Sequence, residues 1–417
     1  MPDDLQVLQL ARLRATIDRL LTRVPVMAQR LRDAGVDSAD DIDTLDDLGR
    51  LPFAHKSDLR DHYPFGLLAV PREHVARIHA SSGTSGKPTV VAYTAADLEM
   101  WADVMARSMA IAGVRAGMLV HNANGYGLFT GGLGFHQGAE RLGATVVPVS
   151  AGFTDRQALL LLDLRAQVLV ATPSYALTIA QAVRDAGHGP GDLALELGLF
   201  GGEPWTEAMR AELDEQLGID AVNFYGLSEI VGPGVSVECR EARDGLHINE
   251  DHFLAEVIDP DSGEPVALGT QGELVFTTLT KEALPMLRYR TGDIAALIDA
   301  PCSCGRLTRR MTAVRGRRDD MLIVRGVNLY PSTVEHVLVG LEGVSAHYEI
   351  VVRRPATLDE LTVRCEPAAP VADGDELAQR IRHALHEATG LNVAVEIHEP
   401  GALPRSEGKA KRVVDER

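Results

Sequence analysis

The fold class follows from a stretch that reads Val168-Leu169-Val170-Ala171, then a helix-length segment, then Leu197-Gly198-Leu199-Phe200. A second helix-length segment separates this run from Ala221-Val222-Asn223-Phe224. Uninterrupted apolar runs are typical of strands that are buried on both faces, and helices between them are typical of parallel connections. The stretch therefore predicts an α/β domain with a mostly parallel sheet that helices cover on both sides.

Other patterns flank this alternation on both sides. Apolar runs at Met118–His121 and Ala144–Val149 add two predicted strands. Short runs between Gly/Pro turns over residues 245–300, Met286–Tyr289 among them, predict a β subdomain packed against the α/β part. Apolar residues at helical spacing over Leu5–Leu31 predict two helices, because Pro25 would interrupt a single one.

The last hundred residues predict a separate, small α+β domain. Strand-like runs at Glu349–Val352 and Leu361–Val363 alternate with helix-like segments at Pro331–Leu341 and Glu376–Thr389. The charged, glycine-containing segment Arg315–Asp320 between two apolar runs is typical of a domain junction. We therefore expect a large domain over residues 1–315 and a small one over residues 316–417.

Composition excludes several classes of function. The chain has 417 residues and a net charge of −18, which argues against binding to nucleic acid or to an anionic membrane. It has no apolar run of the roughly 20 residues that cross a bilayer, and its acidic start, Met1-Pro2-Asp3-Asp4, does not resemble a secretory signal. Four cysteines do not make a disulfide scaffold in a chain of this length. These features predict a cytoplasmic, reduced protein.

Residues 80–89 read Ala-Ser-Ser-Gly-Thr-Ser-Gly-Lys-Pro-Thr and predict a phosphate-binding loop. Hydroxyls, backbone N–H groups and an ammonium are the donors that polyphosphate oxygens need. Pro88 and Ser81 exclude the common nucleotide loop, in which a helix begins at the lysine. Strand-like Val75–Ala80 and Thr89–Tyr93 favour a hairpin tip over a flexible linker. The residues expected to contact phosphate are Ser81, Ser82, Gly83, Thr84, Ser85, Gly86 and Lys87.

Three more motifs lie near predicted strand ends, where α/β sheets bind ligands. In Tyr225-Gly226-Leu227-Ser228-Glu229, the tyrosine offers a flat face for a base and the glutamate offers a hard oxygen for Mg²⁺. Gly201-Gly202-Glu203-Pro204 lets a planar ring lie against the backbone. In Tyr289-Arg290-Thr291-Gly292-Asp293, the aspartate could accept both hydroxyls of a ribose. Each motif alone also fits core packing or an ordinary turn, and together they indicate a nucleotide site.

A fourth set of residues predicts a metal site. Cys239, His247, Cys302 and Cys304 supply four ligands suited to tetrahedral Zn²⁺. Buried, reduced thiols are the alternative. Because no base or substrate motif accompanies the set, we interpret the zinc as structural. Cys365 is expected in the core.

Taken in order along the chain, these motifs resemble the phenylacetate–coenzyme A ligase family of the adenylate-forming superfamily, and the resemblance covers nearly the whole chain. Further matching stretches are Leu51–Phe53, Tyr63–Gly66, Tyr126–Gly134, Thr172–Tyr175, Arg325–Asn328 and Leu403–Arg412. The resemblance implies that a carboxylate attacks the α-phosphate of MgATP, releasing pyrophosphate, and that a thiol then displaces AMP from the acyl-adenylate. It also implies a mobile C-terminal domain that rotates between the two half-reactions, and a homodimer.

The resemblance also implies individual roles. Lys409 would bridge the carboxylate and the α-phosphate, with Lys411 as a nearby competitor, and Asp319 matches the hinge. The implied catalytic residues are Lys409, Glu229, Lys87 and Thr84. The implied nucleotide-binding residues beyond the loop are Gly202, Glu203, Pro204, Tyr225, Gly226, Ser228, Asp293 and Arg317. The implied acid-binding residues are Tyr126, Gly127, Phe129, His136, Gln137 and Gly201.

Two departures from the family pattern leave the substrate and the acceptor open. Gln137 stands where the family has a tyrosine, and Ser150–Thr154 reads Ser-Ala-Gly-Phe-Thr in place of Ser-Gly-Gly-Asn-Thr. A more polar pocket would admit a hydroxy- or aminobenzoate, such as 3-hydroxyanthranilate, beside arylacetates. Coenzyme A is the expected acceptor, the phosphopantetheine of a carrier protein is the alternative, and a non-catalytic nucleotide-binding protein is the third hypothesis.

Overall fold

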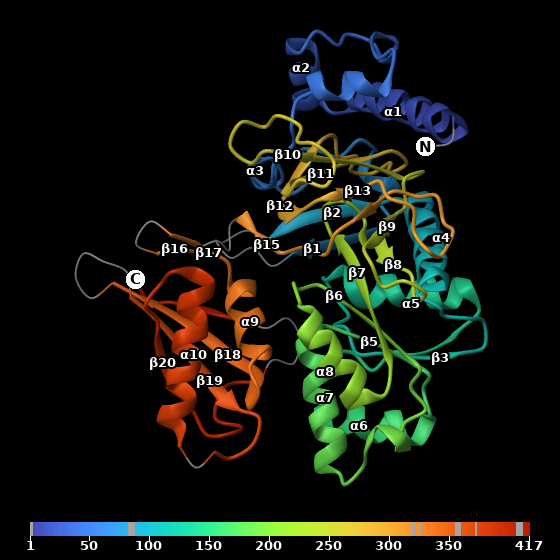
Figure 1. The fold of residues 1–417 in the computed structure, drawn as a ribbon. Coiled ribbons are helices and arrows are strands. Elements are labelled where there is room, and N and C mark those ends of the chain that lie inside the picture. The colour runs from blue at the N-terminus through green and yellow to red at the C-terminus, as the bar shows by residue number, and fades with distance from the viewer. Residues whose placement is uncertain are drawn as a thin grey trace.

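The computed structural model describes residues 3–81, 88–318, 322–324, 327–354, 360–371, 373–405 and 412–417. In Figure 1 a large body carries the N-terminal helices at one end, and the C-terminal elements form a unit beside it. The helices are α1 (Asp3–Arg23), α2 (Pro25–Asp33), α3 (Lys56–Asp61), α4 (Ala95–Ile111), α5 (Thr130–Leu142), α6 (Thr154–Leu164), α7 (Pro173–Asp185), α8 (Glu207–Leu217), α9 (Pro331–Val339) and α10 (Gly374–Thr389).

The main sheet has the strand order β13-β14-β9-β8-β7-β6-β5-β3-β4. Its strands are β3 (Leu119–Asn122), β4 (Thr145–Val147), β5 (Val168–Ala171), β6 (Leu197–Gly201), β7 (Asp220–Leu227), β8 (Gly232–Glu238), β9 (Leu246–Ile248), β13 (Leu297–Ile298) and β14 (Arg310–Met311). The pairs from β4 to β7 are parallel and those from β7 to β13 are antiparallel. The predicted parallel sheet is thus confirmed over β3–β7 and is extended by antiparallel strands.

Helices cover both faces of this sheet, as predicted. Residues of α4 and α5, such as Trp101 and Phe135, join one buried cluster. Residues of α6, α7 and α8, such as Leu161, Tyr175 and Leu213, join another on the opposite face. Burial of these side chains, at roughly 25 cal/mol per Å² of apolar surface, is the main force that holds the helices on the sheet.

A second sheet and a hairpin complete the large body. The second sheet has the order β10-β11-β12-β15, and its strands are β10 (Phe253–Ile258), β11 (Gly272–Thr278), β12 (Tyr289–Ala295) and β15 (Gly316–Arg317). The predicted hairpin is confirmed as β1 (Arg77–Ser81) paired antiparallel with β2 (Thr89–Tyr93).

Two predicted strand boundaries were wrong. Met286–Tyr289 is not a strand, because Arg288 has a φ of +43°, which extended backbone does not allow, so β12 begins only at Tyr289. Strand β7 does not end at Phe224 but continues to Leu227, because β8 pairs with it in antiparallel register. The first three residues of the motif, Tyr225–Leu227, therefore lie within the strand, and Ser228 and Glu229 lie in the turn after it.

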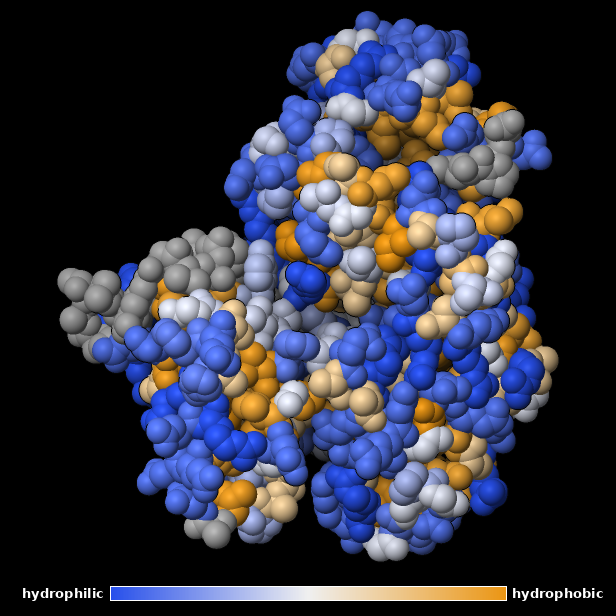
Figure 2. Space-filling model, viewed as in Figure 1, coloured by the Kyte–Doolittle hydropathy of each residue, from blue (hydrophilic) through white to orange (hydrophobic). Residues whose placement is uncertain are grey.

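The C-terminal elements have a sheet and a core of their own. The sheet order is β20-β19-β18-β21, formed by β20 (Ala394–Ile397), β19 (Glu360–Pro367), β18 (Val344–Arg353) and β21 (Val413–Asp415), and β16 (Leu322–Val324) pairs with β17 (Val327–Leu329). Their buried cluster includes Leu338, Ile350 and Ile381, and Cys365 lies in it as expected. In Figure 2 a furrow separates this unit from the large body at the lower end of the view. Among the described residues, no helix has the length and apolarity of a membrane span.

Candidate active site

The nucleotide motifs meet between β7 and β12. The Tyr225 hydroxyl donates to Asp293 Oδ2 at 2.7 Å, and Arg317 Nη1 donates to Asp293 Oδ1 at 3.0 Å. Burial, together with the charge of Asp293, raises the pKa of Tyr225 well above its usual range, so the phenol stays a donor. Arg317 also donates to the Thr291 carbonyl oxygen at 3.1 Å. Three predicted residues thus form one hydrogen-bonded set with a fixed carboxylate at its centre.

Two glycines, Gly201 and Gly226, allow close approach of β6 to β7 and of β7 to β8. A Cβ on Gly201 would lie 2.1 Å from the Phe224 carbonyl oxygen, and one on Gly226 would lie 2.0 Å from the Gly232 carbonyl oxygen. Any larger side chain would push the strands apart at the edge where the nucleotide motifs lie. Gly202 and Pro204 follow on the same chain segment, with Gly202 at a φ of +85°.

Side chains of β2 and α5 contact the turn that carries Ser228 and Glu229. The Tyr93 hydroxyl donates to the Val231 carbonyl oxygen at 3.0 Å and lies 3.4 Å from that of Ser228. The Ser228 hydroxyl contacts Thr130 Oγ1 at 3.1 Å. Glu229 is buried, and among the described residues no hydrogen bond engages its carboxylate. That carboxylate therefore fits the predicted role of a hard-oxygen ligand for Mg²⁺.

A lysine that the sequence analysis did not single out lies beneath this turn. Lys281 is 3% exposed, and its Nζ lies 4.6 Å from the centre of the Tyr93 ring, without a hydrogen-bond partner in the described part of the chain. Burial lowers the pKa of Lys281 to about 8, while the charges of Asp97 and Glu229 oppose that lowering. A cation thus lies within electrostatic reach of the proposed Mg²⁺ ligand.

Most of the predicted phosphate loop lies outside the described residues, namely Ser82, Gly83, Thr84, Ser85, Gly86 and Lys87. Its two ends are described: Ser81 pairs with Thr89 at the end of the hairpin from which the loop leaves. The hydroxyls of both residues are buried and lack a partner among the described groups. Because buried hydroxyls are normally hydrogen-bonded, these two are available to a ligand or to water.

The predicted acid-binding residues form a polar network at the start of α5. The Tyr126 hydroxyl accepts from Asn122 Nδ2 at 2.9 Å and contacts His136 Nδ1 at 3.1 Å. Burial raises the pKa of Tyr126 to about 12. Gln137 Oε1 accepts from Arg77 Nη1 at 3.1 Å, so its amide oxygen is already bound by the protein.

The other two predicted acid-binding residues differ in their surroundings. Gly127 has a φ of +110°, which favours glycine, and Phe129 is more than half exposed at the N-cap of α5. The structure therefore places Phe129 at a surface and not within a buried pocket wall.

Lys409, Lys411 and the hinge residue Asp319 lie outside the described residues, but both ends of the lysine segment are anchored. Arg405 donates to both carboxylate oxygens of Glu366, at 3.0 and 2.7 Å. On the other side, Arg412 Nη2 donates to Ser174 Oγ at 3.2 Å, at the start of α7. Arg405 and the backbone of Arg412 thus belong to the C-terminal unit, while the side chain of Arg412 reaches the large body.

Arg412 also joins a buried polar cluster between the two units. It stacks over the Tyr348 ring at 4.4 Å, and its Nη2 lies 3.7 Å from Glu335 Oε2. On the large-body side of the interface, Glu203 Oε1 accepts a hydrogen bond from the Ser174 N–H at 2.8 Å. Glu203, predicted to bind nucleotide, therefore caps α7 in this structure.

The four predicted zinc ligands come together. Their ligand atoms all lie within 4.8 Å of one another, with Cys239 Sγ 3.7 Å from Cys302 Sγ and Cys304 Sγ 3.4 Å from His247 Nε2. A tetrahedral zinc with bonds of about 2.3 Å to sulfur implies sulfur–sulfur separations near ~3.8 Å, so the cluster fits the metal. The His247 Nδ1 contacts Thr308 Oγ1 at 2.9 Å, which turns Nε2 toward the thiols. Burial and nearby arginines lower the pKa of His247 to about 4, which leaves it neutral and able to bind metal.

Zinc removal gives the first prediction. We expect about one zinc per chain by elemental analysis. We also expect Cys302→Ser to lose the metal and to lower Tm by roughly 5 °C or more, because the metal links β9 to the segment before β14. Cys365→Ala is the matched control, since its thiol lies in the other unit and should not affect the metal content. Metal-free wild-type protein with an unchanged Tm would contradict the prediction.

A second prediction concerns Asp293. Asp293→Asn removes the charge that holds Tyr225 and Arg317 and turns one acceptor into a donor. Since a charged hydrogen bond contributes about 1.5–3 kcal/mol, we expect KM for ATP to rise at least about tenfold, with a smaller change in kcat. Asp299→Asn, at an exposed aspartate, should leave KM unchanged. An unchanged KM in the Asp293 variant would exclude a ribose contact.

Two family models match the chain: AMP-binding enzyme over residues 8–279 and AMP-binding enzyme C-terminal domain over residues 326–417. The curated protein Phenylacetate-coenzyme A ligase of Thermus thermophilus is 53% identical over 431 residues, covering 99% of this chain and 97% of that protein.

The solved structures give a similar result. 2-Hydroxyisobutyryl-CoA ligase in the postadenylation state, in complex with R3-HIB-AMP, is 29% identical and superposes with a TM-score of 0.92, covering 98% of this chain and 89% of that chain. In the thioesterification state, with 2-HIB-AMP and CoA, that ligase is 30% identical and gives a TM-score of 0.75 over 100% of this chain and 90% of that chain. The two units of this structure are thus arranged more like the postadenylation state.

Proposed function

Since this chain belongs to the phenylacetate–coenzyme A ligase family of adenylate-forming enzymes, we propose that its acid substrate is an arylacetate, with phenylacetate as the first candidate. The chain is an AMP-forming acid–thiol ligase that uses ATP and coenzyme A. The binding of Gln137 by Arg77 supports an apolar acid, because the polar group that would favour a hydroxybenzoate is already bound.

The chemistry assigns a role to each part of the site. The substrate carboxylate attacks the α-phosphorus, the bond to the β,γ-pyrophosphate breaks, and pyrophosphate leaves. Negative charge grows on the phosphoryl oxygens and on the leaving group, and pre-positioned donors stabilise it. The coenzyme A thiol then attacks the acyl carbon and releases AMP.

The roles proposed for the described residues rest on their contacts, and those proposed for Thr84, Lys87 and Lys409 rest on the resemblance to the family. Asp293, fixed by Tyr225 and Arg317, would accept the ribose hydroxyls, and the Ser81–Thr89 hairpin would direct its loop, with Thr84 and Lys87, at the phosphates. Glu229 would hold Mg²⁺, which supplies charge neutralisation at the pyrophosphate. Lys409 would neutralise the carboxylate and the α-phosphate as they approach each other. Tyr126 and His136 would line the acid-binding side.

The single observation that carries the proposal is the hydrogen-bonded Tyr225–Asp293–Arg317 set between β7 and β12, with Asp293 buried at its centre, in a chain of this family. The test is acid-dependent exchange of ATP with labelled pyrophosphate over a panel of arylacetates, benzoates and aminohydroxybenzoates. Exchange that is fastest with phenylacetate supports the proposal. Exchange only with an aminohydroxybenzoate would overturn the substrate assignment while keeping the reaction class.

Several finer points stay predictions. We propose that the two units are domains with a boundary at residues 315/316, that the zinc is structural, and that the protein is cytoplasmic, which its reduced cysteines support. Product formation with free coenzyme A, against none with a carrier protein, would exclude the carrier alternative. Light scattering would test the homodimer.

A further inference from the structure

Three polar side chains form a hydrogen-bonded line from the loop before α5 to solvent. The Tyr126 hydroxyl lies 3.1 Å from His136 Nδ1, and His136 Nε2 lies 3.2 Å from Glu140 Oε1. The Tyr126 and His136 rings meet edge to face, with their centres 5.8 Å apart. Exposure rises along the line, from the half-buried Tyr126 to a Glu140 side chain that is 62% exposed. These three residues are called the tyrosine relay below.

Asn122 gives the hydrogen bonds of the tyrosine relay a direction. Its Nδ2 donates to the Gly132 carbonyl oxygen at 2.8 Å and to the Tyr126 hydroxyl oxygen at 2.9 Å. Since a carbonyl oxygen only accepts, the NH₂ group of Asn122 is the group that faces Tyr126. The Tyr126 hydroxyl therefore receives one hydrogen bond from Asn122 and donates its own proton to His136 Nδ1. The neutral imidazole then carries its proton on Nε2, which donates to Glu140.

The chain segment that carries Tyr126 lies between two parts of the phosphate region. The Leu128 carbonyl oxygen accepts from the Ala80 N–H at 2.9 Å, near the end of β1 from which the phosphate loop leaves. Two residues later, Thr130 Oγ1 contacts the Ser228 hydroxyl at 3.1 Å, in the turn proposed to hold Mg²⁺. The tyrosine relay therefore begins beside the place where the acyl-adenylate is expected to form.

The second half-reaction has a proton to remove from the thiol. A thiol with the ordinary pKa of about 8.5 is only about 3% thiolate at pH 7, and the thiolate is the nucleophile. A group that takes the proton as sulfur approaches the acyl carbon removes this limit on the rate.

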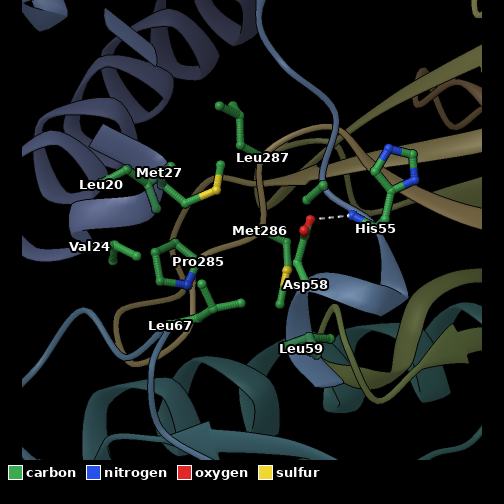
Figure 3. A pocket seen from close by; sticks show the side chains of 11 residues that line it. Leu20, Val24, Met27, His55, Asp58, Leu59, Leu67, Pro285, Met286 and Leu287 are labelled. Atoms are coloured by element: carbon green, nitrogen blue, oxygen red, sulfur yellow. Dashed lines mark hydrogen bonds between the residues drawn. The ribbon is translucent and has the colours of Figure 1, made fainter. Parts of the chain in front are cut away.

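Two other groups that could accept a proton have different surroundings. Asp58 lies at a small apolar pocket lined by residues of α1 and α2 (Figure 3), where its carboxylate accepts from the His55 N–H at 2.8 Å and from Arg30 at 2.9 and 2.6 Å. His79, on β1, is 1% exposed, and burial lowers its pKa, so it is a poor acceptor enclosed by the interior. Unlike these two groups, the tyrosine relay ends in an exposed carboxylate.

We propose that the tyrosine relay takes the thiol proton in the second half-reaction, with Tyr126 as the residue that touches the thiol. The inference rests on the ligase function and adds residue roles to it. As sulfur bonds to the acyl carbon, the S–H proton passes to the Tyr126 oxygen and the phenol proton passes to His136 Nδ1. The bond between the acyl carbon and the AMP oxygen breaks, and AMP leaves with that electron pair. The imidazolium then gives its Nε2 proton to Glu140 and through it to water.

The three residues of the tyrosine relay have different roles. Because burial raises the pKa of Tyr126 to about 12, the phenol does not ionise in advance and passes one proton on while it accepts another. His136 and Glu140 act through Tyr126 and are positioning residues. The charged groups beside the relay are Glu140 on α5 and Arg77 on β1, which binds the neighbouring Gln137.

The test measures the two half-reactions separately in His136→Gln and in Glu140→Gln. Transfer from supplied phenylacetyl-adenylate to coenzyme A reports the second half-reaction, and ATP–pyrophosphate exchange reports the first. We expect His136→Gln to slow transfer about 30-fold at pH 7 relative to its own exchange rate, since without a proton acceptor only the thiolate fraction reacts. We expect Glu140→Gln to slow transfer about threefold or more and to leave exchange unchanged. His383→Gln is the matched control, because His383 forms the same i,i+4 pair with Glu387 on α10, in the other unit.

Raising the pH gives a readout that a structural role would not move. At pH 9 the thiol of coenzyme A is mostly ionised by itself, so the deficit of His136→Gln should shrink to within about threefold, and Tyr126→Phe should show the same recovery. A deficit of the same size at pH 7 and pH 9, or one that slows exchange as much as transfer, would overturn the inference. Unimpaired transfer in His136→Gln at pH 7 would also overturn it, whereas wild-type protein without any exchange would refute the ligase function itself.

Discussion

Lys409→Ala is expected to lower ATP–pyrophosphate exchange by about 100-fold or more, because loss of one pre-positioned charge in a water-excluded site typically costs that much. The described residues on either side support the assignment. Arg405 ties the start of the segment to Glu366, and Arg412 ties its end to Ser174. Arg412, three residues after Lys409 in the sequence, thus contacts Ser174, whose backbone N–H is bound by Glu203.

The same variant should convert supplied phenylacetyl-adenylate and coenzyme A to product within a few-fold of the wild-type rate. The second half-reaction breaks the acyl–phosphate bond and does not need a cation between carboxylate and ATP. Lys411→Ala, two residues away, is the control and should retain exchange. Equal loss of both half-reactions in Lys409→Ala would refute the bridging role. Loss of exchange in Lys411→Ala but not in Lys409→Ala would assign that role to Lys411.

Glu238→Ala is expected to be the most destabilising single change. Glu238 Oε2 and Oε1 each accept from Arg210 at 2.9 Å, and Oε2 also accepts from the Asn223 backbone N–H at 2.8 Å. Both side chains are almost fully buried. Removing the carboxylate leaves the guanidinium without its buried partner, so that only the exposed carboxylate of Glu207 still pairs with it, and loss of a buried partner costs about 3–5 kcal/mol.

We therefore expect Glu238→Ala to lower Tm by roughly 5–8 °C. Glu207→Ala is the matched control, because it removes another carboxylate from the same arginine. That carboxylate is 76% exposed, so its loss should lower the free energy of unfolding by less than about 1 kcal/mol. Replacing the pair by Arg210→Met and Glu238→Leu should restore much of the Tm. A Glu238 variant no less stable than the Glu207 variant would refute the account.

The parallel strands and their covering helices could be predicted because each apolar run is long enough to identify by itself. The antiparallel strand β14 is two residues long and exists only through pairing across the chain, so no local pattern indicates it. The extension of β7 through Tyr225 likewise depends on β8, which comes later in the sequence.

The same distinction holds for the site. Asp293, Tyr225 and Arg317 belong to short motifs and could be predicted, as could the four zinc ligands from their residue types. Lys281 could not, because its neighbourhood is ordinary in composition and its significance comes from burial. The stretch Thr172–Tyr175 matches the family, but the contact of Ser174 with Arg412 could not be predicted because that partner is far away in sequence.

The buried cluster around Arg412 implies that closing the two units takes up protons. Burial raises the pKa of Glu335 to about 7, and Glu203 and Glu212 of the large body add to the rise, while Arg412 and Tyr348 oppose it through their attraction and hydrogen bond. Opening the interface would remove the contribution of the large body and return the pKa toward the ordinary value of a glutamate, near 4.3. The closed arrangement therefore holds more protons between these two values.

Low pH therefore favours the arrangement of the two units seen in this structure. The proton-linked stabilisation of that arrangement is lost as the pH rises through 7. Proton uptake on closure can be measured by calorimetry of AMP binding in buffers of different ionisation enthalpy. Glu335→Gln, which cannot titrate, should abolish the buffer dependence. In this enzyme the switch between half-reactions would then be coupled to the proton concentration around it, through the carboxyl group of Glu335 in the buried cluster between the two units.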